Sequence, residues 1–351
     1  MQIDSIESYK QQIKPLNEAA IVEAALHLDQ LTKPQGSLGK LESIAKQVAG
    51  ITGEKIPDLS RKAVIVMAGD HGVCAEGISA FPAEVTPQMV MNFLHGGAAV
   101  NVLARQAGAE VICVDIGVNA DLAHPQLVSR KVRKGTGNIA HGPAMTREEA
   151  LQAIAVGWEL VEELFGRGVR LFATGEMGIG NTTSSAAILI VLAGIAAQQA
   201  VGRGTGIDET RWHHKQEVIA QAIAVNQADA SDALDVLSKL GGFEIAGLVG
   251  VILGAAAHRC PVIIDGFISS AAALIASRLA PLCVDYMLGS HLSLEQGHAA
   301  MLDAIGLAPM LQLDMRLGEG TGAVLAFYFV DAALRIMSEM ATFTSAGVSN
   351  A

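Results

Sequence analysis

The chain has 351 residues; 51% are hydrophobic but only 4% are aromatic, so its apolar content is mostly Ala, Val, Ile, Leu and Met. This composition favours buried parallel strands covered by Ala-rich helices, and the length favours one large domain with a smaller appendage, or two domains. The net charge of -11, from 24 basic and 35 acidic residues, argues against a nucleic-acid-binding surface.

The sequence predicts neither a membrane span nor a secretory signal. The N-terminus is polar and lacks an apolar signal-peptide core. The most apolar stretches, 186–197 and 245–257, fall short of the ~20 residues that a spanning helix needs, so we expect core helices there. The four cysteines are widely spaced without a Cys-x-x-Cys pair, which argues against a zinc or disulfide framework. We therefore expect a cytoplasmic protein.

Helical and strand patterns alternate along the chain. Residues up to about 60 have an amphipathic helical pattern, interrupted by a loop at 32–39. Four short apolar runs, each followed by Gly or a carboxylate, are typical of strands, and Ala-rich helical sequence separates them: 62–67, 111–116, 170–174 and 261–264. This order predicts an α/β fold with a parallel sheet. Because such sheets bind ligands at the carboxyl ends of their strands, we look there for the chemistry.

The stretch Gly175-Glu176-Met177-Gly178-Ile179-Gly180-Asn181-Thr182-Thr183 joins a predicted strand to an apolar helix. Glycines let backbone N–H groups converge, and a helix N-terminus favours an anion, so this loop is a candidate for phosphate or substrate binding. It is not a Walker A loop, because no Gly-Lys-Ser/Thr follows. The alternative is a tight turn in which Asn181 or Thr182 is the helix N-cap.

A second candidate loop, Gly202-Arg203-Gly204-Thr205-Gly206, precedes His213, His214 and Lys215. Flexible backbone beside a cation suits a phosphate monoester. An ordinary loop with solvated charges explains the pattern equally well. No adjacent acidic pair precedes the loop, which argues against a magnesium-bound pyrophosphate substrate.

The third candidate is Glu319, in the segment Arg316-Leu317-Gly318-Glu319-Gly320-Thr321-Gly322. A carboxylate flanked by glycines can reach a ligand and act as a general base. Equally, it can be a helix N-terminal acid that complements the macrodipole. The ten histidines show no zinc-ligand spacing, so we predict no metal site and expect His291 and His298 to be hydrogen-bonded structural residues.

Together these stretches resemble the nicotinate-nucleotide–dimethylbenzimidazole phosphoribosyltransferase (CobT) family. The matching segments follow one another over nearly the whole chain: 31–39, 67–73, 175–183, 241–247, 290–293 and 316–322. The resemblance implies a Rossmann-like parallel sheet with helices on both faces, formed by 61–330. It also implies a small helical domain built from 1–60 and 331–351, and a homodimer.

The resemblance further implies a reaction between two small-molecule substrates, nicotinate mononucleotide and 5,6-dimethylbenzimidazole, which gives α-ribazole 5′-phosphate and nicotinate. Glu319 matches the family's catalytic glutamate. Glu176, Gly178, Gly180 and Asn181 fall in its substrate loop. Lys215, which follows the Gly204 loop in the sequence, lies where the family contacts phosphate, and we expect Gly204 to belong to the substrate site as well. We expect neither a metal nor another cofactor, because the pyridine nitrogen of the donor already carries a positive charge.

The acceptor base needs apolar walls, and Phe81, Met89, Met177 and Leu317 are candidates, although each could instead belong to the core. Apolar pockets discriminate by only ~1–3 kcal/mol per methylene. Adenine, another benzimidazole or a phenol therefore remains an alternative acceptor. Two further classes stay open: a nicotinamide-dependent oxidoreductase, which the absence of Gly-x-Gly-x-x-Gly after the first strand disfavours, and a non-catalytic mononucleotide-binding module.

Overall fold

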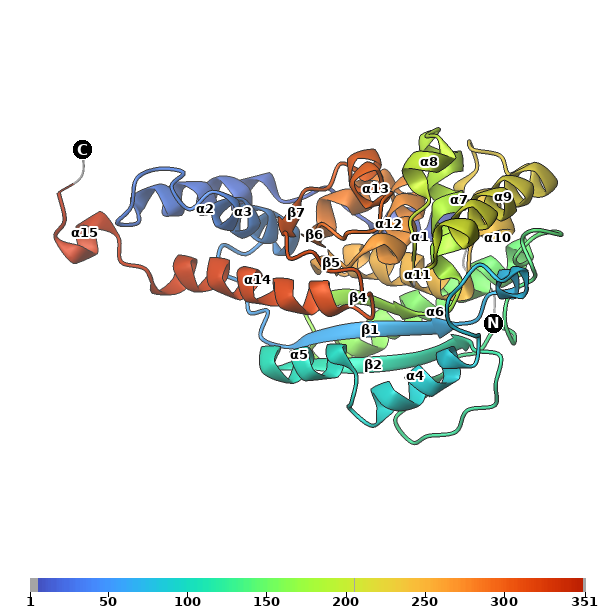
Figure 1. Cartoon of the computed structure of the whole chain (residues 1–351). Coiled ribbons are helices and arrows are strands. Elements are labelled where there is room, and N and C mark those ends of the chain that lie inside the picture. The colour runs from blue at the N-terminus through green and yellow to red at the C-terminus, as the bar shows by residue number, and fades with distance from the viewer. Residues whose placement is uncertain (1–5, 205, 350–351) are drawn as a thin grey trace.

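The computed structural model of the protein describes residues 6–204 and 206–349, and its strands within these ranges form a single parallel sheet of order β3-β2-β1-β4-β5-β6-β7 (Figure 1). The strands are β1 (Lys62–Gly69), β2 (Ala109–Gly117), β3 (Val128–Ser129), β4 (Leu171–Met177), β5 (Val262–Ile264), β6 (Met287–His291) and β7 (Pro309–Leu311). The chain first builds outward from β1 through β2, then returns to add β4 on the other side. The sheet therefore has a topological switch point between β1 and β4, where open α/β sheets bind ligands.

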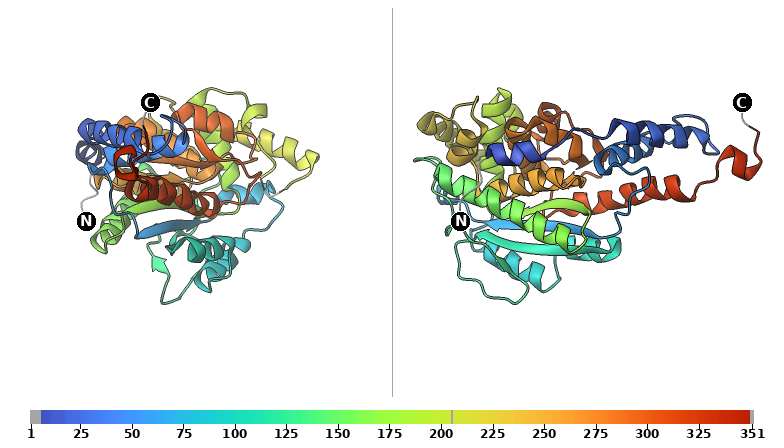
Figure 2. Two further views of the ribbon diagram at one scale, coloured as in Figure 1. Left: turned by 90° about the vertical axis from the view of Figure 1, so that its left-hand side faces the viewer. Right: turned by 180° about the vertical axis from the view of Figure 1, so that it is seen from behind.

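Helices cover both faces of the sheet, which confirms the predicted α/β class. They are α1 (Ile6–Gln12), α2 (Glu18–Gln30), α3 (Lys40–Thr52), α4 (Val85–Leu94), α5 (Ala99–Ala107), α6 (Arg147–Gly166), α7 (Asn181–Ala193), α8 (Ala197–Ala200), α9 (Glu209–Asn226), α10 (Ala233–Leu240), α11 (Phe243–Ala257), α12 (Phe267–Leu279), α13 (His298–Ile305), α14 (Thr321–Glu339) and α15 (Phe343–Ala346), with short 3₁₀ helices η1 (Gly72–Glu76) and η2 (Pro281–Tyr286). Helices α6, α11 and α12 pack on one face, and α3, α4, α5 and α14 on the other (Figures 1 and 2).

The central strand β1 shows why the chain needs two helical layers. Every residue from Lys62 to Gly69 is buried, so the strand has no solvent-facing side. Its side chains alternate between two separate cores. Ile65 and Met67 join the cluster under α6 and α11, whereas Val64 and Val66 join the cluster under α3 and α14. A continuous apolar strand thus fits a sheet that is covered on both sides.

The two ends of the chain meet beside this sheet. Helices α2 and α3 lie along α14 and extend away from the strands (Figure 1). An antiparallel bridge between Leu31 and Thr342 joins the loop after α2 to the segment after α14. The boundary expected at 330/331 falls inside α14, which belongs to both the extension and the core. The division into 1–60 with 331–351 and 61–330 stays a prediction.

Helix α14 is also the one described helix long and apolar enough to cross a membrane by length and composition, with a mean hydropathy of 1.3. Half of it is buried inside the fold. On its buried side, Val324, Phe327 and Val330 are fully inaccessible, and Asp331 forms an ion pair with Lys62 of β1. These contacts are those of a core helix.

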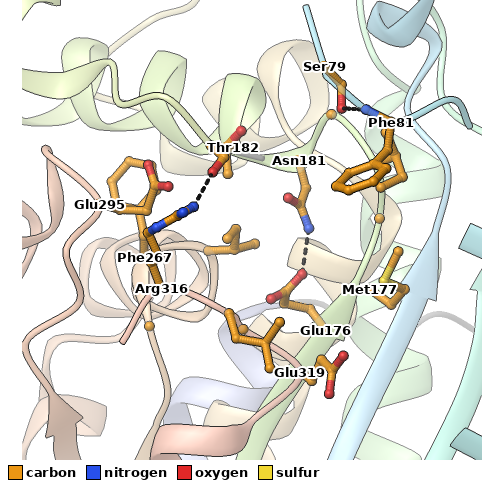
Figure 3. Close-up of a pocket in the computed structure, with 18 of the residues that line it drawn as sticks. Ser79, Phe81, Glu176, Met177, Asn181, Thr182, Phe267, Glu295, Arg316 and Glu319 are labelled. Atoms are coloured by element: carbon orange, nitrogen blue, oxygen red, sulfur yellow. Dashed lines mark hydrogen bonds between the residues drawn. The ribbon is translucent and has the colours of Figure 1, made fainter. Parts of the chain in front are cut away.

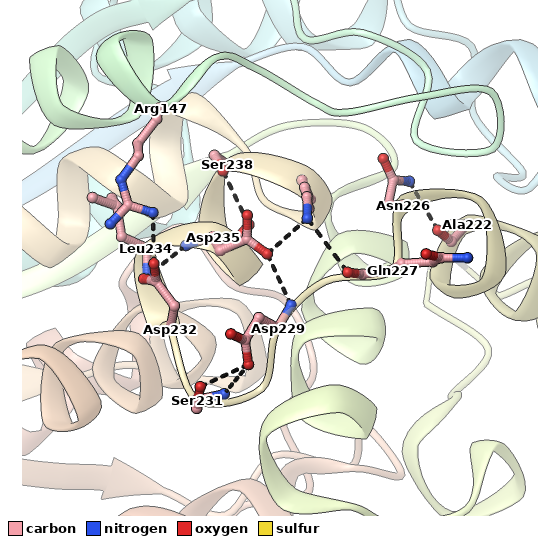
Figure 4. A network of polar contacts seen from close by, with 11 residues as sticks. Arg147, Ala222, Asn226, Gln227, Asp229, Ser231, Asp232, Leu234, Asp235 and Ser238 are labelled. Carbon is pink, nitrogen blue, oxygen red and sulfur yellow. Dashed lines mark hydrogen bonds and ion pairs between the residues drawn. The ribbon is translucent and has the colours of Figure 1, made fainter.

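The connection between α9 and α10 is fixed by polar contacts (Figure 4). Asp232 caps α10, because its Oδ1 accepts hydrogen bonds from the backbone N–H groups of Leu234 and Asp235 at 3.0 and 3.1 Å. Its Oδ2 lies 2.7 Å from Arg147 at the start of α6. This cap ties α10 to α6 on the side of the sheet that carries α11.

Candidate active site

A cavity of about 490 Å³ opens at the carboxyl ends of the strands, next to the β1/β4 switch point. Ten of the eleven residues proposed from the sequence line it: Phe81, Met89, Glu176, Met177, Gly178, Gly180, Asn181, Gly204, Leu317 and Glu319. The eleventh, Lys215, is buried directly behind the wall. The structure thus brings together segments that lie more than 230 residues apart in the chain. Figure 3 shows their polar side chains converging on one space.

Glu319 is held by an unusual backbone. Its φ is +63°, and the flanking Gly318 and Gly320 have φ of +89° and +94°. A left-handed conformation is costly for a side-chain-bearing residue, so its persistence here points to function. The close packing beneath it also needs glycine, because a Cβ on Gly175 would lie 2.5 Å from the Glu319 carbonyl oxygen. The Glu319 carboxylate faces the cavity and accepts a hydrogen bond from the Val100 N–H at 3.4 Å.

The acid that caps helix α14 is Asp265, not Glu319. Asp265 follows β5, and its two oxygens accept hydrogen bonds from the N–H groups of Gly320 at 3.1 Å and Ala323 at 2.9 Å. Asp265 therefore satisfies the helix N-terminus and leaves the Glu319 carboxylate free of that role. Glu319 is therefore not the acid that caps α14, although its carboxylate accepts the Val100 N–H from the first turn of α5.

The surroundings of Glu319 also set its protonation. Burial raises the pKa of Glu319, the Val100 N–H lowers it, and the negative charge of Asp265 raises it again, for a net upward shift. A carboxylate whose pKa is raised toward neutrality is a better proton acceptor than an ordinary one.

Glu176 lies beside Glu319 in the same wall (Figure 3). Its Oε2 accepts a hydrogen bond from Asn181 Nδ2 at 2.5 Å, and the backbone N–H of Glu319 also donates to the carboxylate. Burial and the charges of Asp265 and Glu244 raise the pKa of Glu176 to about 8. At neutral pH Glu176 is therefore mostly protonated, so the two glutamates differ in the proton chemistry that they can perform.

The glycine loop before α7 is a wall of the cavity and not a conventional helix cap. The N-cap position is Gly180, with φ +94° and no side-chain cap, so neither Asn181 nor Thr182 is the N-cap. Asn181 instead binds Glu176, and Thr182 Oγ1 accepts a hydrogen bond from Lys215 Nζ at 2.7 Å. The N–H groups of Asn181 and Thr183 donate to the carbonyls of Gly178 and Gly180 at 3.1 and 3.0 Å. The N-terminus of α7 itself lies at the cavity, where the helix dipole favours an anion.

Lys215 places a cation at that same end. Its side chain is 1% exposed, unlike His213 and His214, which are exposed on the same helix. A Cβ on Gly204 would lie 3.2 Å from Lys215 Nζ, so the glycine lets the loop approach the amine. Burial lowers the pKa of Lys215 to about 8, against the opposing charge of Glu295. Thr205 of this loop lies outside the described residues.

The opposite end of the cavity is apolar. Phe81, Val85 and Met89, from the segment around α4, line the cavity together with Leu317, and Phe81 and Leu317 are 53% and 58% exposed. Exposed apolar side chains of this size at a cavity mouth provide surface for a flat aromatic ligand. Met177 lines the cavity as well.

The two histidines expected to be structural lie differently. His298 is buried, with Nε2 3.0 Å from Ser270 Oγ and Nδ1 accepting the Ser293 N–H at 2.8 Å. His291 lines the cavity, with Nδ1 3.0 Å from Ser290 Oγ. Within 6–204 and 206–349, no three His, Cys, Asp or Glu residues are arranged to hold a metal ion.

Sequence reasoning assigned no role to several residues in and around the cavity. Asp265, which does not line the cavity but caps α14, directly follows a predicted strand, so the strand-end rule could have identified it. Ser293, Glu295 and Arg316 line the cavity. Ser293 and Arg316 lie in matched segments without an assigned role, and Glu295 follows β6, which was not predicted. Arg316 Nη1 donates to the Gly204 carbonyl at 3.3 Å and so joins two of the candidate loops.

Comparison with known proteins gives one consistent result. A family model described as phosphoribosyltransferase matches residues 13–348. The protein named nicotinate-nucleotide–dimethylbenzimidazole phosphoribosyltransferase from Chloroflexus aggregans is 57% identical over 338 residues, covering 96% of both chains. The protein of that name from Chlorobium chlorochromatii is 54% identical over 347 residues, covering 99% of this chain and 98% of its own. The crystal structure of CobT from Thermus thermophilus superimposes with a TM-score of 0.91 at 46% identity, covering 95% of this chain and 100% of that one.

Proposed function

This chain belongs to the phosphoribosyltransferase family, and we propose from that premise that it transfers the ribose 5-phosphate of nicotinate mononucleotide to 5,6-dimethylbenzimidazole. The products are α-ribazole 5′-phosphate and nicotinate, which places the enzyme in cobalamin lower-ligand synthesis. Full-length relatives with more than half of their residues identical carry this activity in their names. The nicotinamide-dependent oxidoreductase is thereby set aside.

The chemical assignment rests on the different chemistry of the two ends of the cavity. One end offers the buried amine of Lys215 and the N-terminus of α7, which together suit a phosphate monoester. The other end offers the apolar surface of Phe81, Met89 and Leu317, which suits an aromatic base. Glu319 lies between them, where the ribose C1′ of a donor anchored by its phosphate would meet the acceptor ring.

The reaction needs one proton acceptor. The unprotonated nitrogen of the benzimidazole attacks C1′ while the bond from C1′ to the pyridinium nitrogen breaks, and that electron pair neutralises the departing nicotinate. The ring would remain cationic unless the proton on its second nitrogen leaves, and we assign its acceptance to Glu319. Attack from the face opposite the leaving group converts the β linkage to α.

Glu176 supports this step in another way. Since its pKa is about 8, it is mostly protonated at neutral pH and donates a hydrogen bond better than it accepts a proton. We therefore assign Glu176 to substrate orientation beside Glu319. Alignment of the two substrates in one cleft provides most of the remaining rate enhancement. We also propose that the enzyme is a cytoplasmic homodimer.

A panel of acceptors tests the substrate assignment. The enzyme is incubated with nicotinate mononucleotide and, in turn, 5,6-dimethylbenzimidazole, benzimidazole, adenine and phenol, and the products are identified by mass. We expect the highest kcat/KM with 5,6-dimethylbenzimidazole. A higher value with adenine or phenol would assign the chain to another acceptor, and donor binding without nicotinate release from any base would indicate a non-catalytic module.

A further inference from the structure

Two segments of the sequence that the reaction does not use meet in the core beneath the cavity. His71 follows the end of β1, and Glu244 lies in the first turn of α11. His71 Nε2 is 2.6 Å from Glu244 Oε1, and the two side chains are 1% and 0% exposed. The other ring nitrogen, Nδ1, is 3.1 Å from Ser184 Oγ in the first turn of α7. One imidazole thus joins the carboxyl end of β1 to the N-terminal turns of two helices.

The surroundings of His71 favour the charged form of its imidazole. Burial lowers the pKa of His71, but the charge and hydrogen bond of Glu244 raise it by more, with a smaller contribution from Asp70. The imidazolium can donate from both nitrogens, to Glu244 and to Ser184. Removing one partner from a buried ion pair leaves an uncompensated charge, so the two residues depend on each other.

The imidazole also supports the substrate loop from below. A Cβ on Gly178 would lie 2.4 Å from the Gly69 carbonyl oxygen and 3.4 Å from His71 Cδ2 and Nε2. A Cβ on Gly180 would lie 3.4 Å from His71 Cβ. The loop between these glycines therefore rests on the ring. Between them, Ile179 is held by two further bonds, in which its N–H donates to Thr86 Oγ1 at 3.1 Å and its carbonyl accepts from Cys74 Sγ at 2.9 Å.

We propose that the His71–Glu244 ion pair is a positioning device that sets the height and orientation of the Gly178–Gly180 turn and, through Ser184, of the N-terminus of α7. Both carry the phosphate end of the cavity, so the pair controls donor binding without touching the donor. Neither side chain lines the cavity. This inference rests on the proposed function for the identity of the donor.

The surrounding titratable groups are few in the described part of the chain. Asp70 precedes His71 and interacts electrostatically with both members of the pair. Cys74 of η1 has its pKa raised to about 12 by burial and by Asp70, so it is neutral at working pH. Glu176 of β4 senses the charge of Glu244. Loss of a charge from the pair would therefore change both the packing beneath the substrate loop and the electrostatic environment of Glu176.

Affinity for the donor tests the proposal. In Glu244→Gln the amide keeps a hydrogen-bond acceptor but removes the charge, and in His71→Gln the ring that supports the loop is lost. We expect each variant to bind nicotinate mononucleotide about tenfold more weakly by calorimetry, since sub-ångström displacements in a site have effects of this size. The KM for 5,6-dimethylbenzimidazole should stay within about twofold, because Phe81, Met89 and Leu317 at the apolar end do not belong to the Gly178–Gly180 turn.

Asp331→Asn is the matched control. It removes the charge from the Lys62–Asp331 ion pair at the opposite end of β1, and neither residue lines the cavity. We expect it to lower the melting temperature while leaving the affinity for the donor unchanged. Equal losses of donor affinity in the control and in Glu244→Gln would reduce the pair to a general stability role and overturn the proposal.

Nitrogen NMR of histidine-labelled protein tests the ion pair itself, whereas donor affinity tests its positioning role. Above pH ~6.5, the ordinary pKa of histidine, we expect one imidazole in the wild type to keep hydrogen on both nitrogens and to lose this signature in Glu244→Gln. A neutral His71 in the wild type would overturn the ion pair. If wild-type protein forms no α-ribazole phosphate but the variants still bind the donor tenfold more weakly, the proposed reaction fails and the positioning role stands.

Discussion

Replacement of Gly178 by alanine tests how closely the substrate loop is fitted to the strand below it. The added Cβ would lie 2.4 Å from the Gly69 carbonyl oxygen, which is backbone and cannot rotate away. The loop must rise by about 0.6 Å to reach 3.0 Å, and by about 1 Å to reach ordinary contact at 3.4 Å. The φ of Gly178 is not positive, so the change adds no backbone strain and its effect comes from displacement alone.

Because a displacement of about 1 Å in a catalytic site can lower the rate ~100-fold, we expect kcat/KM with nicotinate mononucleotide and 5,6-dimethylbenzimidazole to fall by ~10- to 100-fold. Overpacking of this kind costs ~1–3 kcal/mol of stability, so the melting temperature should fall by only a few degrees. Initial rates of nicotinate release measure the first effect and calorimetry the second.

Gly142→Ala is the control, because nothing lies within 4 Å of its Cβ position and its φ is not positive. It should keep wild-type rates and stability. Unchanged kcat/KM in Gly178→Ala would mean that the loop can move by this distance without consequence, and the assignment of Gly178 to a fitted substrate loop would be refuted.

Three further predictions concern the proton acceptor and the phosphate end. Glu319→Gln should lower kcat by ~100- to 10,000-fold at an unchanged melting temperature. It should also abolish the fall in rate that protonation of Glu319 causes in the wild type as the pH drops below its pKa. A variant that keeps full turnover would exclude Glu319 as the base. Lys215→Met should raise the KM for the donor ~10- to 100-fold and leave the acceptor KM alone, and equal effects on both would argue against a phosphate contact. In the wild type, donor affinity should decline as pH rises through about 8, because Lys215 loses its positive charge and Glu176 gains a negative one over that range. Calorimetry between pH ~6.5 and ~9.5 measures this affinity, and a constant value would contradict the prediction.

Four strands of the sheet could be predicted because each is a run of apolar residues followed by Gly or a carboxylate. The segments 62–67, 111–116, 170–174 and 261–264 contain or overlap β1, β2, β4 and β5. The three remaining strands could not be predicted because their sequences lack a clear apolar strand pattern. β3 has two residues, β7 begins with proline, and β6 reads Met-Leu-Gly-Ser-His, whose polar half is buried only by tertiary contacts.

In the site, too, features that depend on neighbouring residues could be predicted, whereas contacts between residues far apart in the sequence could not. The glycines after Glu176 indicated a phosphate- or substrate-binding loop, and the glycines that flank Glu319 indicated an accessible carboxylate. Both residues line one cavity. The sequence alone could not separate a base from a helix-terminal acid at Glu319, because the answer depends on Asp265, which lies 55 positions before Gly320 and caps α14 in place of Glu319. Nor could it join His71 to Glu244, which are 173 positions apart.

The most direct test of the account is the stoichiometry of the reaction with wild-type enzyme and Glu319→Gln side by side. Nicotinate mononucleotide and 5,6-dimethylbenzimidazole are supplied together, and nicotinate and the ribosylated base are quantified by chromatography and mass, with the anomeric linkage assigned by proton NMR. We expect equimolar nicotinate and α-linked ribazole 5′-phosphate from the wild type, and neither at a comparable rate from Glu319→Gln. Nicotinate release with free ribose 5-phosphate, or equal product from both proteins, would contradict the account.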